Sequence, residues 1–353
     1  MTSSITISRG RFGSTAAQVL ELARAAGRAS RDEIAAASGL SVATVGRAAT
    51  TLVGHGLLRE RPDLARAGTT GRPGVPVEID RDRYLTIGVH VGRRIATVAI
   101  GDLTGRVLDS TSVRRPLGTA PDLDRLSRLA AGLLGTRPGQ VPLAAGLVGP
   151  WRDLHLGAGE LEVAWHELTG LPVRTGDHIS AIAAAEFLHR RHRADAGHGM
   201  TLYLYARDTI GWSVAVERDG QTQVTRAASL THFPTRSRVS CACRRPGCLA
   251  ATVATLDDDD RARLLGEVAG VVRDMLSPDQ VVLVGQAFTG VPSTLDAVVA
   301  AYDAHTALDH AVPVSFTRFG SDIQAISACT VALGPVYDDP IAVVVDHACR
   351  RGA

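Results

Sequence analysis

Closely spaced thiols and an imidazole are the residues of this 353-residue chain whose types and spacing most clearly suggest chemistry. His232 precedes Cys241, Cys243 and Cys248 in the pattern His-x8-Cys-x-Cys-x4-Cys. Three thiolates and one imidazole can complete a closed tetrahedron, which is typical of a structural Zn²⁺ with no open position for water. The alternative is a set of buried cysteines without a ligand, but a polar, arginine-rich segment makes poor core material. We therefore predict zinc at these four residues.

The composition limits where the chain works and how large it is. Five cysteines are too few for a disulfide framework in 353 residues. No apolar run follows a basic N-terminal start, and no stretch approaches the roughly 20 apolar residues that span a bilayer. We expect a soluble, cytoplasmic protein. The length and the 45% hydrophobic content indicate at least two domains.

The charge is distributed unevenly. The net charge is +2, and residues 1–80 hold ten arginines against seven acidic residues, so this part carries +3 and the remainder −1. We expect any contact with nucleic acid in the N-terminal part. All 38 basic residues are arginine, which points to GC-rich coding more than to selection for an activity.

Three short helices are expected in this N-terminal part. Apolar residues recur at helical spacing over residues 14–26, and a glycine follows. Residues 30–33 form a capping box that opens a second helix, which Gly39 ends. Ser41 then caps a third helix. Two short helices joined at Gly39 predict a helix-turn-helix.

A hairpin follows the third helix. Residues 57–61 and the alternating apolar residues 75–79 are expected to form two strands. Between them Arg72 stands in a Gly-Arg-Pro-Gly turn, residues 71–74. Such a turn can lay a guanidinium into a narrow, electronegative minor groove. We therefore predict a wing with Arg72 as its DNA contact.

The third helix is the expected reader of the major groove. Its early outward positions carry Ser41, Ala43, Thr44 and Arg47, where the side chains of a recognition helix reach base edges. The alternative is that three alanine-rich helices and a hairpin form a small structural or dimerising domain. No single residue decides between these two interpretations. The combination of motifs favours DNA binding.

Beyond residue 80 the pattern changes to alternating strands and helices, which predicts an α/β fold. Apolar runs predict strands at residues 85–91, 95–100, 143–147, 202–205, 214–217 and 281–284. Two such lobes would enclose a cleft, the usual place for a small ligand. We divide the chain into residues 1–80, which bind DNA, and residues 81–353, which sense an effector, form a dimer and include a zinc loop at 232–248.

This long region resembles the ROK family, which comprises repressors, uncharacterised reading frames and sugar kinases built on the actin-like ATPase fold. Four segments carry the resemblance: residues 87–92 with 102–105, Trp165 ahead of residues 170–173, residues 177–181 running to Glu186, and the zinc segment. The repressor branch also has an N-terminal winged helix and a Gly-Arg-Pro wing. The resemblance implies a winged helix-turn-helix followed by a two-lobed actin-like domain.

The chain departs from the kinase pattern at both carboxylate positions. Kinases of the family have an Asp at the first strand turn where this chain has His90, and Arg93 lies where Gly-Thr is expected. An imidazole does not replace a carboxylate on Mg²⁺. Aligning on Glu186 puts Asp177 at the family's sugar-binding Asn and His178 at its base. A one-residue slip would restore an Asp as base but would move Glu186 out of register.

The second phosphate loop is also altered. It is glycine-rich in the kinases, whereas residues 206–213 include Asp208 and Trp212, which would crowd or repel a nucleotide. The Glu residues that contact sugar in the relatives are Ser229 and Ala250 here. The cleft residues are either neutral packing, or His90, Arg93, His178 and Arg207 line a cleft for an anionic or phosphorylated ligand. The sequence does not separate these two interpretations.

The sequence thus predicts a transcription regulator that is not an enzyme. We expect a ligand-responsive regulator, a repressor or an activator, homodimeric or tetrameric, that binds a palindromic operator in double-stranded DNA. Its effector would be a sugar derivative or an anionic metabolite. Two alternatives stay open: a sugar kinase with an accessory DNA-binding domain, and a DNA-binding dimer without an effector.

Overall fold

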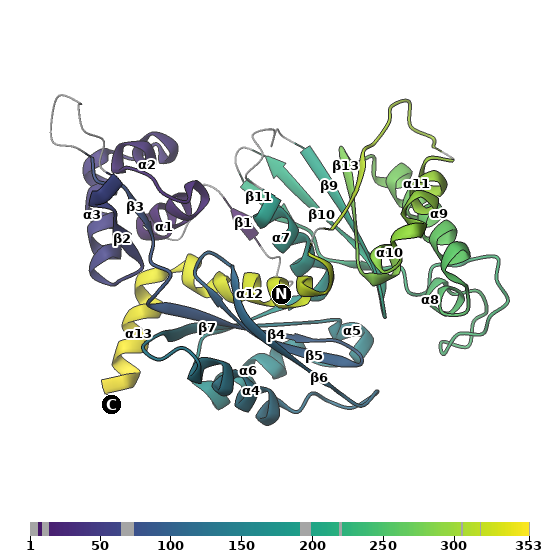
Figure 1. Ribbon diagram of the computed structural model, residues 1–353, viewed down its shortest axis with the longest axis horizontal. Coiled ribbons are helices and arrows are strands. Elements are labelled where there is room, and N and C mark those ends of the chain that lie inside the picture. Colours follow the sequence, from purple (N-terminus) through teal and green to yellow (C-terminus); the bar gives the residue numbers. More distant parts are fainter. Residues whose placement is uncertain are drawn as a thin grey trace. The chain divides into compact units, whose positions relative to one another are not determined.

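The computed structural model describes residues 6–8, 14–64, 74–190, 199–218, 221–304, 306–317 and 319–352. The chain forms two compact units (Figure 1). Unit 1 consists of Met1–Thr6 and Asp177–Ile323, and unit 2 consists of Ile7–Gly176 and Gln324–Ala353. The domain boundary expected at residue 80 stays a prediction.

The N-terminal part of unit 2 is a helix-turn-helix with a small antiparallel sheet, as predicted. Its elements are α1 (Thr15–Ala26), α2 (Arg31–Ser38), α3 (Val42–Gly54), β2 (Leu58–Glu60), the 3₁₀ turn η1 (Pro62–Leu64) and β3 (Val77–Ile79). A serine caps each helix: Ser14 accepts from an α1 amide, Ser30 forms the capping box with Glu33, and Ser41 accepts from the Thr44 amide. These side chains satisfy amides that have no partner within the helix.

A five-stranded mixed sheet forms the rest of unit 2. Its order is β6-β5-β4-β7-β8, and β4 runs antiparallel to β5 but parallel to β7. The strands are β4 (Tyr84–Val91), β5 (Ile95–Asp102), β6 (Val107–Arg114), β7 (Val141–Gly149) and β8 (Val173–Asp177). The helices are α4 (Leu123–Gly135), α5 (Trp151–Leu154), α6 (Ala158–Thr169), α12 (Ile323–Asp338) and α13 (Pro340–Gly352). The strands predicted at residues 85–91 and 95–100 are confirmed as β4 and β5.

Helix α12 lies directly on the backbone of this sheet. A Cβ added to Gly88 would stand 2.6 Å from the Cys329 amide nitrogen, and one added to Gly146 would stand 2.5 Å from the Ala332 nitrogen. Real Cβ atoms do not approach other atoms this closely, so both positions require glycine. On the opposite face, Ile87 and Val89 belong to a separate apolar cluster, because neighbouring strand residues point to opposite faces.

Unit 1 contains most of a seven-stranded sheet of order β1-β11-β10-β9-β13-β14, in which β12 pairs with β10. Strand β9 is antiparallel to β10 and parallel to β13. The strands are β9 (Gly199–Ala206), β10 (Ile210–Arg218), β11 (Gln221–Val224), β12 (Ala228–Ser229), β13 (Gln280–Val284) and β14 (Val314–Phe316). The helices are α7 (His178–Arg190), α8 (Leu249–Val253), α9 (Asp258–Leu276), α10 (Gln286–Thr289) and α11 (Leu295–Asp303), and two 3₁₀ turns, η2 (Pro292–Thr294) and η3 (Gly320–Asp322), complete it. The remaining short strand is β1 (Thr6–Ser8).

Within the described residues, no single helix is both long and apolar enough to cross a bilayer. Helices α12 and α13 meet that criterion only as a pair bent by 94°.

Candidate nucleic-acid interface, metal centre and kinase-like site

Helix α3 turns one face into the core and the other outward. Val45, Ala49 and Leu52 are fully buried. Ser41, Ala43 and Arg47 are exposed and Thr44 is half-buried, as expected for the reading face of a recognition helix. The structure therefore leaves all four predicted major-groove residues on the side of α3 that a partner can reach.

The polar residues of this face are linked to one another. The Ser41 hydroxyl accepts a hydrogen bond from the Thr44 amide at 3.2 Å and lies 2.8 Å from the Thr44 hydroxyl. Arg47 Nη2 donates to Thr44 Oγ1 across 3.4 Å, a long and weak bond. Ser41 is thus committed to the cap, whereas the Arg47 guanidinium is only loosely held and can turn to a base or phosphate.

Two residues of α3 that the sequence analysis did not select belong to the same surface. Val42, the first residue of the helix, is 51% exposed. Gly46 stands mid-helix, and a Cβ built on it would meet no atom within 4 Å. Glycine costs a helix about 1 kcal/mol relative to alanine. No contact among the described residues requires glycine at this half-buried position, so a glycine in the middle of a helix was the signal available in the sequence.

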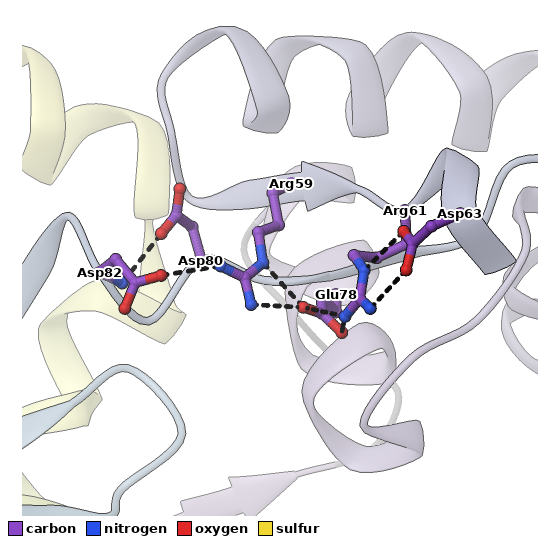
Figure 2. Close-up of polar contacts among 6 residues, drawn as sticks. All are labelled: Arg59, Arg61, Asp63, Glu78, Asp80 and Asp82. Atoms are coloured by element: carbon purple, nitrogen blue, oxygen red, sulfur yellow. Dashed lines mark hydrogen bonds and ion pairs between the residues drawn. The ribbon is translucent and has the colours of Figure 1, made fainter.

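The base of the wing is a network of charges that neutralise one another (Figure 2). Arg59 donates to Glu78 at 2.7 Å and to Asp82 at 2.8 Å. Arg61 donates to Asp63 at 2.7 Å and to the same Glu78 at 2.9 Å. Partial burial opposes ionisation of Glu78, but the bonds from the two arginines hold its pKa below the ordinary value. These arginines fix β2 against β3 and have acidic partners already.

Arg72, the predicted minor-groove contact, lies outside the described residues. Gly74, the last residue of its turn, is described and exposed.

The four predicted metal ligands converge in unit 1. One donor atom from each of His232, Cys241, Cys243 and Cys248 lies within 4.8 Å of all the others. The Cys241 sulfur is 3.6 Å from His232 Nδ1, and the Cys243 and Cys248 sulfurs are 3.5 Å apart. A disulfide needs about 2.05 Å, so these are free thiols. Three soft sulfurs and an imidazole at this separation suit a tetrahedral metal ion.

The loop around the thiols is fixed by its backbone. Isolated bridges pair Ser240 with Pro246 and Pro234 with Cys248. Gly247 has a φ of +71°, and a Cβ there would stand 2.5 Å from the Ser237 carbonyl oxygen. Only glycine fits such a position. The hairpin-like loop therefore brings the three cysteines together through backbone geometry.

The kinase-like position in unit 1 is closed by protein contacts. His178, the first residue of α7, is buried, its Nε2 lies 2.7 Å from the Thr209 hydroxyl, and its ring meets Tyr205 edge-on at 5.2 Å. Burial lowers the pKa of His178 to about 3, so the imidazole is neutral. Asp177 Oδ1 accepts from the Ile179 amide at 2.9 Å.

The remaining predicted ligand residues divide between the two units. Arg207 lies in the turn between β9 and β10 in unit 1, where its amide donates to the Thr209 carbonyl at 3.0 Å. The structure thus brings Asp177, His178 and this turn together. In unit 2, His90 is buried near the end of β4, and Arg93 is exposed in the turn that follows.

Comparison with known proteins supports both parts of this description. Residues 16–62 match the IclR helix-turn-helix domain. Transcriptional regulator Rv0485 of Mycobacterium tuberculosis is 32% identical over 386 aligned residues, which cover 93% of this chain and 87% of that protein. This similarity extends well beyond the helix-turn-helix and spans both units.

Solved structures show the same fold. A ROK family transcriptional regulator described as a homologue of the E. coli MLC protein aligns with a TM-score of 0.68 at 17% identity, over 94% of this chain and 98% of that one. A ROK family glucokinase from Streptomyces griseus aligns with a TM-score of 0.57 at 18% identity, over 70% of this chain and 99% of that one. The helix-turn-helix match and the relative named a regulator lead to one assignment: this chain belongs to the same family as transcriptional regulator Rv0485, is a DNA-binding transcription regulator, and has the fold of ROK family proteins.

Proposed function

We propose that this regulator binds a palindromic operator as a homodimer, with α3 of each copy in a major groove and Arg72 in the adjacent minor groove. The observation that carries the proposal is the outward face of α3, where the capped first turn presents Ala43 and a loosely held Arg47. Such a helix reads base edges with its N-terminal residues. We assign residues 1–80 to DNA binding and residues 81–353 to sensing and dimerisation, in the cytoplasm.

Gel-shift titration against an operator selected from random duplexes tests this proposal. Arg47→Ala should weaken operator binding by about 1–3 kcal/mol and relax the preference at one base position of each half-site. Arg128→Ala is the matched control, because it removes an exposed arginine from α4 in the same unit. Equal affinities of Arg47→Ala and Arg128→Ala would show that α3 is not the reading surface.

We propose that the four converging ligands hold a structural Zn²⁺. Cysteine and histidine suit zinc, and a closed set of four protein ligands ties a loop together without offering a position for water. The metal would fix residues 232–248 against α8, whose first residue follows Cys248. Elemental analysis should find one zinc per chain, and Cys243→Ser should lose it. Cys349→Ser, which changes an exposed thiol elsewhere, should keep it.

We propose that the kinase-like site does not transfer phosphate. A base for a sugar hydroxyl must accept a proton near neutral pH, and His178 is buried, neutral and bonded to Thr209. A coupled assay with ATP and glucose, N-acetylglucosamine or mannose should show no turnover. Turnover abolished by Asp177→Asn would contradict the proposal and favour the slipped alignment.

We propose that a small anionic effector or sugar derivative is recognised in unit 1, where Arg207 belongs to the same turn as Thr209, the partner of His178. Because His178 is neutral, the Arg207 guanidinium is the cationic candidate there. An effector that prefers one conformation shifts DNA affinity by its differential binding energy, typically about 1–3 kcal/mol. Sugar phosphates should raise the melting temperature more than the neutral sugars, and Arg207→Gln should reduce that difference. No shift with any of them would favour an effector-independent dimer.

A further inference from the structure

The helix-turn-helix of unit 2 shares its hydrophobic core with the sheet behind it. The cluster that contains Leu20 of α1 and Leu52 of α3 also contains Leu103, Leu143 and Val336. These last three residues come from the β5–β6 turn, β7 and α12. The helix-turn-helix is therefore packed against the sheet of unit 2 and is not joined to it by a flexible linker alone.

A buried ion pair lies within this shared core. Arg24 donates from Nε to Glu21 at 2.7 Å and from Nη2 to the second carboxylate oxygen at 2.5 Å. The side chains are only 8% and 7% exposed. A bidentate pair of this kind fixes the plane and direction of the guanidinium, which apolar packing does not do.

Tyr337 of α12 contacts this ion pair. The Arg24 guanidinium carbon lies 5.6 Å from the centre of the Tyr337 ring, within the range of a cation–π contact. The Tyr337 hydroxyl donates to the Leu103 carbonyl at 2.7 Å. Glu21, Arg24, Tyr337 and Leu103 thus connect α1 to α12 and to the turn after β5 in one continuous set of contacts.

A second polar link supports the same orientation. The Tyr84 hydroxyl of β4 donates to the carbonyl of His55 at 2.9 Å, and His55 is the C-cap of α3. The recognition helix is therefore attached at its C-terminal end to the central strand of unit 2. Two directional contacts at different points fix an angle, whereas a single contact would leave a pivot.

We propose that Arg24 and Tyr337 are positioning residues for DNA recognition, which set the orientation of α3 relative to α12 and the sheet of unit 2. The inference rests on the proposed homodimer, in which this orientation determines the distance between the two recognition helices. Neither residue touches DNA in this scheme. They act through α1, which packs against α3.

Helix α12 is suited to transmit a change to this joint. It begins at Ile323, where the chain returns from unit 1 to unit 2. It then lies on Gly88 and Gly146 without an intervening layer of side chains. Because no layer of side chains lies between α12 and the sheet there, none can absorb a displacement of the helix. Tyr337 and the Glu21–Arg24 ion pair therefore move with α12.

The test compares the intact chain carrying Tyr337→Leu with the wild type and with Arg174→Gln. Arg174 pairs with Asp338, the neighbour of Tyr337 on α12, so this control alters the same helix end without touching α1. Binding is measured on a duplex with one selected half-site, on two half-sites at the selected spacing, and on two half-sites with one added base pair.

We expect the wild type and Arg174→Gln to prefer the selected spacing by about a hundredfold over a single half-site, and to lose most of this on insertion of a base pair. Tyr337→Leu should bind one half-site as the wild type does but should tolerate the insertion to within about threefold. Tyr337→Phe, which keeps the ring over Arg24, should restore most of the spacing preference.

Hydrogen exchange gives a readout that does not depend on the dimer. Peptides covering residues 15–26 should exchange faster in Tyr337→Leu than in Arg174→Gln. An unchanged spacing penalty or an unchanged exchange rate in Tyr337→Leu would overturn the proposal, and so would a loss of half-site binding, since the role would then be structural. If the wild type shows no spacing preference, the proposed binding of DNA by a homodimer is wrong. The hydrogen-exchange comparison would then decide by itself whether Tyr337 positions α1.

Discussion

The starts of helices α3 and α7 are built alike and used differently. Ser41 caps α3 through the Thr44 amide, and Asp177 accepts from the Ile179 amide at the start of α7. After the cap, α3 presents Arg47 to solvent, whereas α7 buries His178 against Thr209 and Tyr205. Polar residues at a helix start offer a binding site only where their side chains remain available. In this chain that is α3, whereas in α7 the His178 side chain is buried against its own protein neighbours.

The largest effect that would test this comparison concerns the buried imidazole. His178 has a pKa of about 3 in the fold and an ordinary value of 6.5 when unfolded. Because the unfolded chain binds the proton first, stability is full above about pH 6.5 and falls by about 1.4 kcal/mol per pH unit below it, until about pH 3. Between about pH 7 and about pH 5 the loss is roughly 2 kcal/mol.

Urea unfolding at these two pH values measures the loss. His178→Gln should be less stable at neutral pH but should show a smaller decrease on acidification. His310→Gln removes an exposed imidazole and should keep the wild-type pH dependence. If both variants follow the wild type, His178 is not held neutral, and the contrast between the two helices disappears.

The next largest effect concerns Gly46 of α3, the helix that presents Arg47 to solvent. Gly46→Ala should stabilise the protein by up to about 1 kcal/mol, because alanine favours the helix and its methyl group meets no atom. If α3 enters the major groove, the same methyl group should hinder close approach and weaken operator binding. Melting temperature and gel-shift affinity, measured on one preparation, check the two opposite effects.

Gly132→Ala is the control for this pair of measurements. Like Gly46, Gly132 is a helical glycine on which an added Cβ would meet no atom within 4 Å, but it lies in α4. It should give a similar rise in stability with unchanged DNA binding. If Gly46→Ala also leaves operator affinity unchanged, Gly46 does not belong to the DNA-reading surface.

The smallest effect is expected at the base of the wing. Arg61 is already paired with Asp63 and Glu78, so Arg61→Gln removes a charge that has little left for DNA phosphates. Exposed pairs contribute about 1 kcal/mol or less. Operator affinity should stay within about twofold of the wild type, in contrast to Arg47→Ala, and urea unfolding should report a small loss of stability. If Arg61→Gln weakened operator binding more than Arg47→Ala does, the main DNA contact would lie in the wing and not in α3.

Features encoded within a few residues could be predicted from the sequence. The serine caps of α2 and α3, the glycine that ends α2 and the His-x8-Cys-x-Cys-x4-Cys loop depend on local hydrogen bonds or short spacing, and the structure confirms their geometry. The strands over residues 85–91 and 281–284 followed from apolar runs and are confirmed within a residue or two.

Features that depend on distant residues could not be predicted in this way. The burial of His178 depends on Thr209 and Tyr205, which belong to a different hairpin. Arg24 meets Tyr337 from the other end of the chain, and nothing in the spacing of either residue indicates the contact. Pairing of Arg59 and Arg61 with Glu78 follows from the register of β2 and β3, which a sequence pattern does not specify to one residue.

The glycines beneath α12 have a consequence for genetics. An alanine at Gly146 would force its methyl group to within 2.5 Å of the Ala332 nitrogen and so would lift α12 from the sheet. Since Tyr337 lies on that helix, such an allele would score as a defect in operator binding, although it lies deep within the fold. Second-site suppressors of it should then arise along α1 and α12, where space can be regained, and not among the residues of α3 proposed to read DNA.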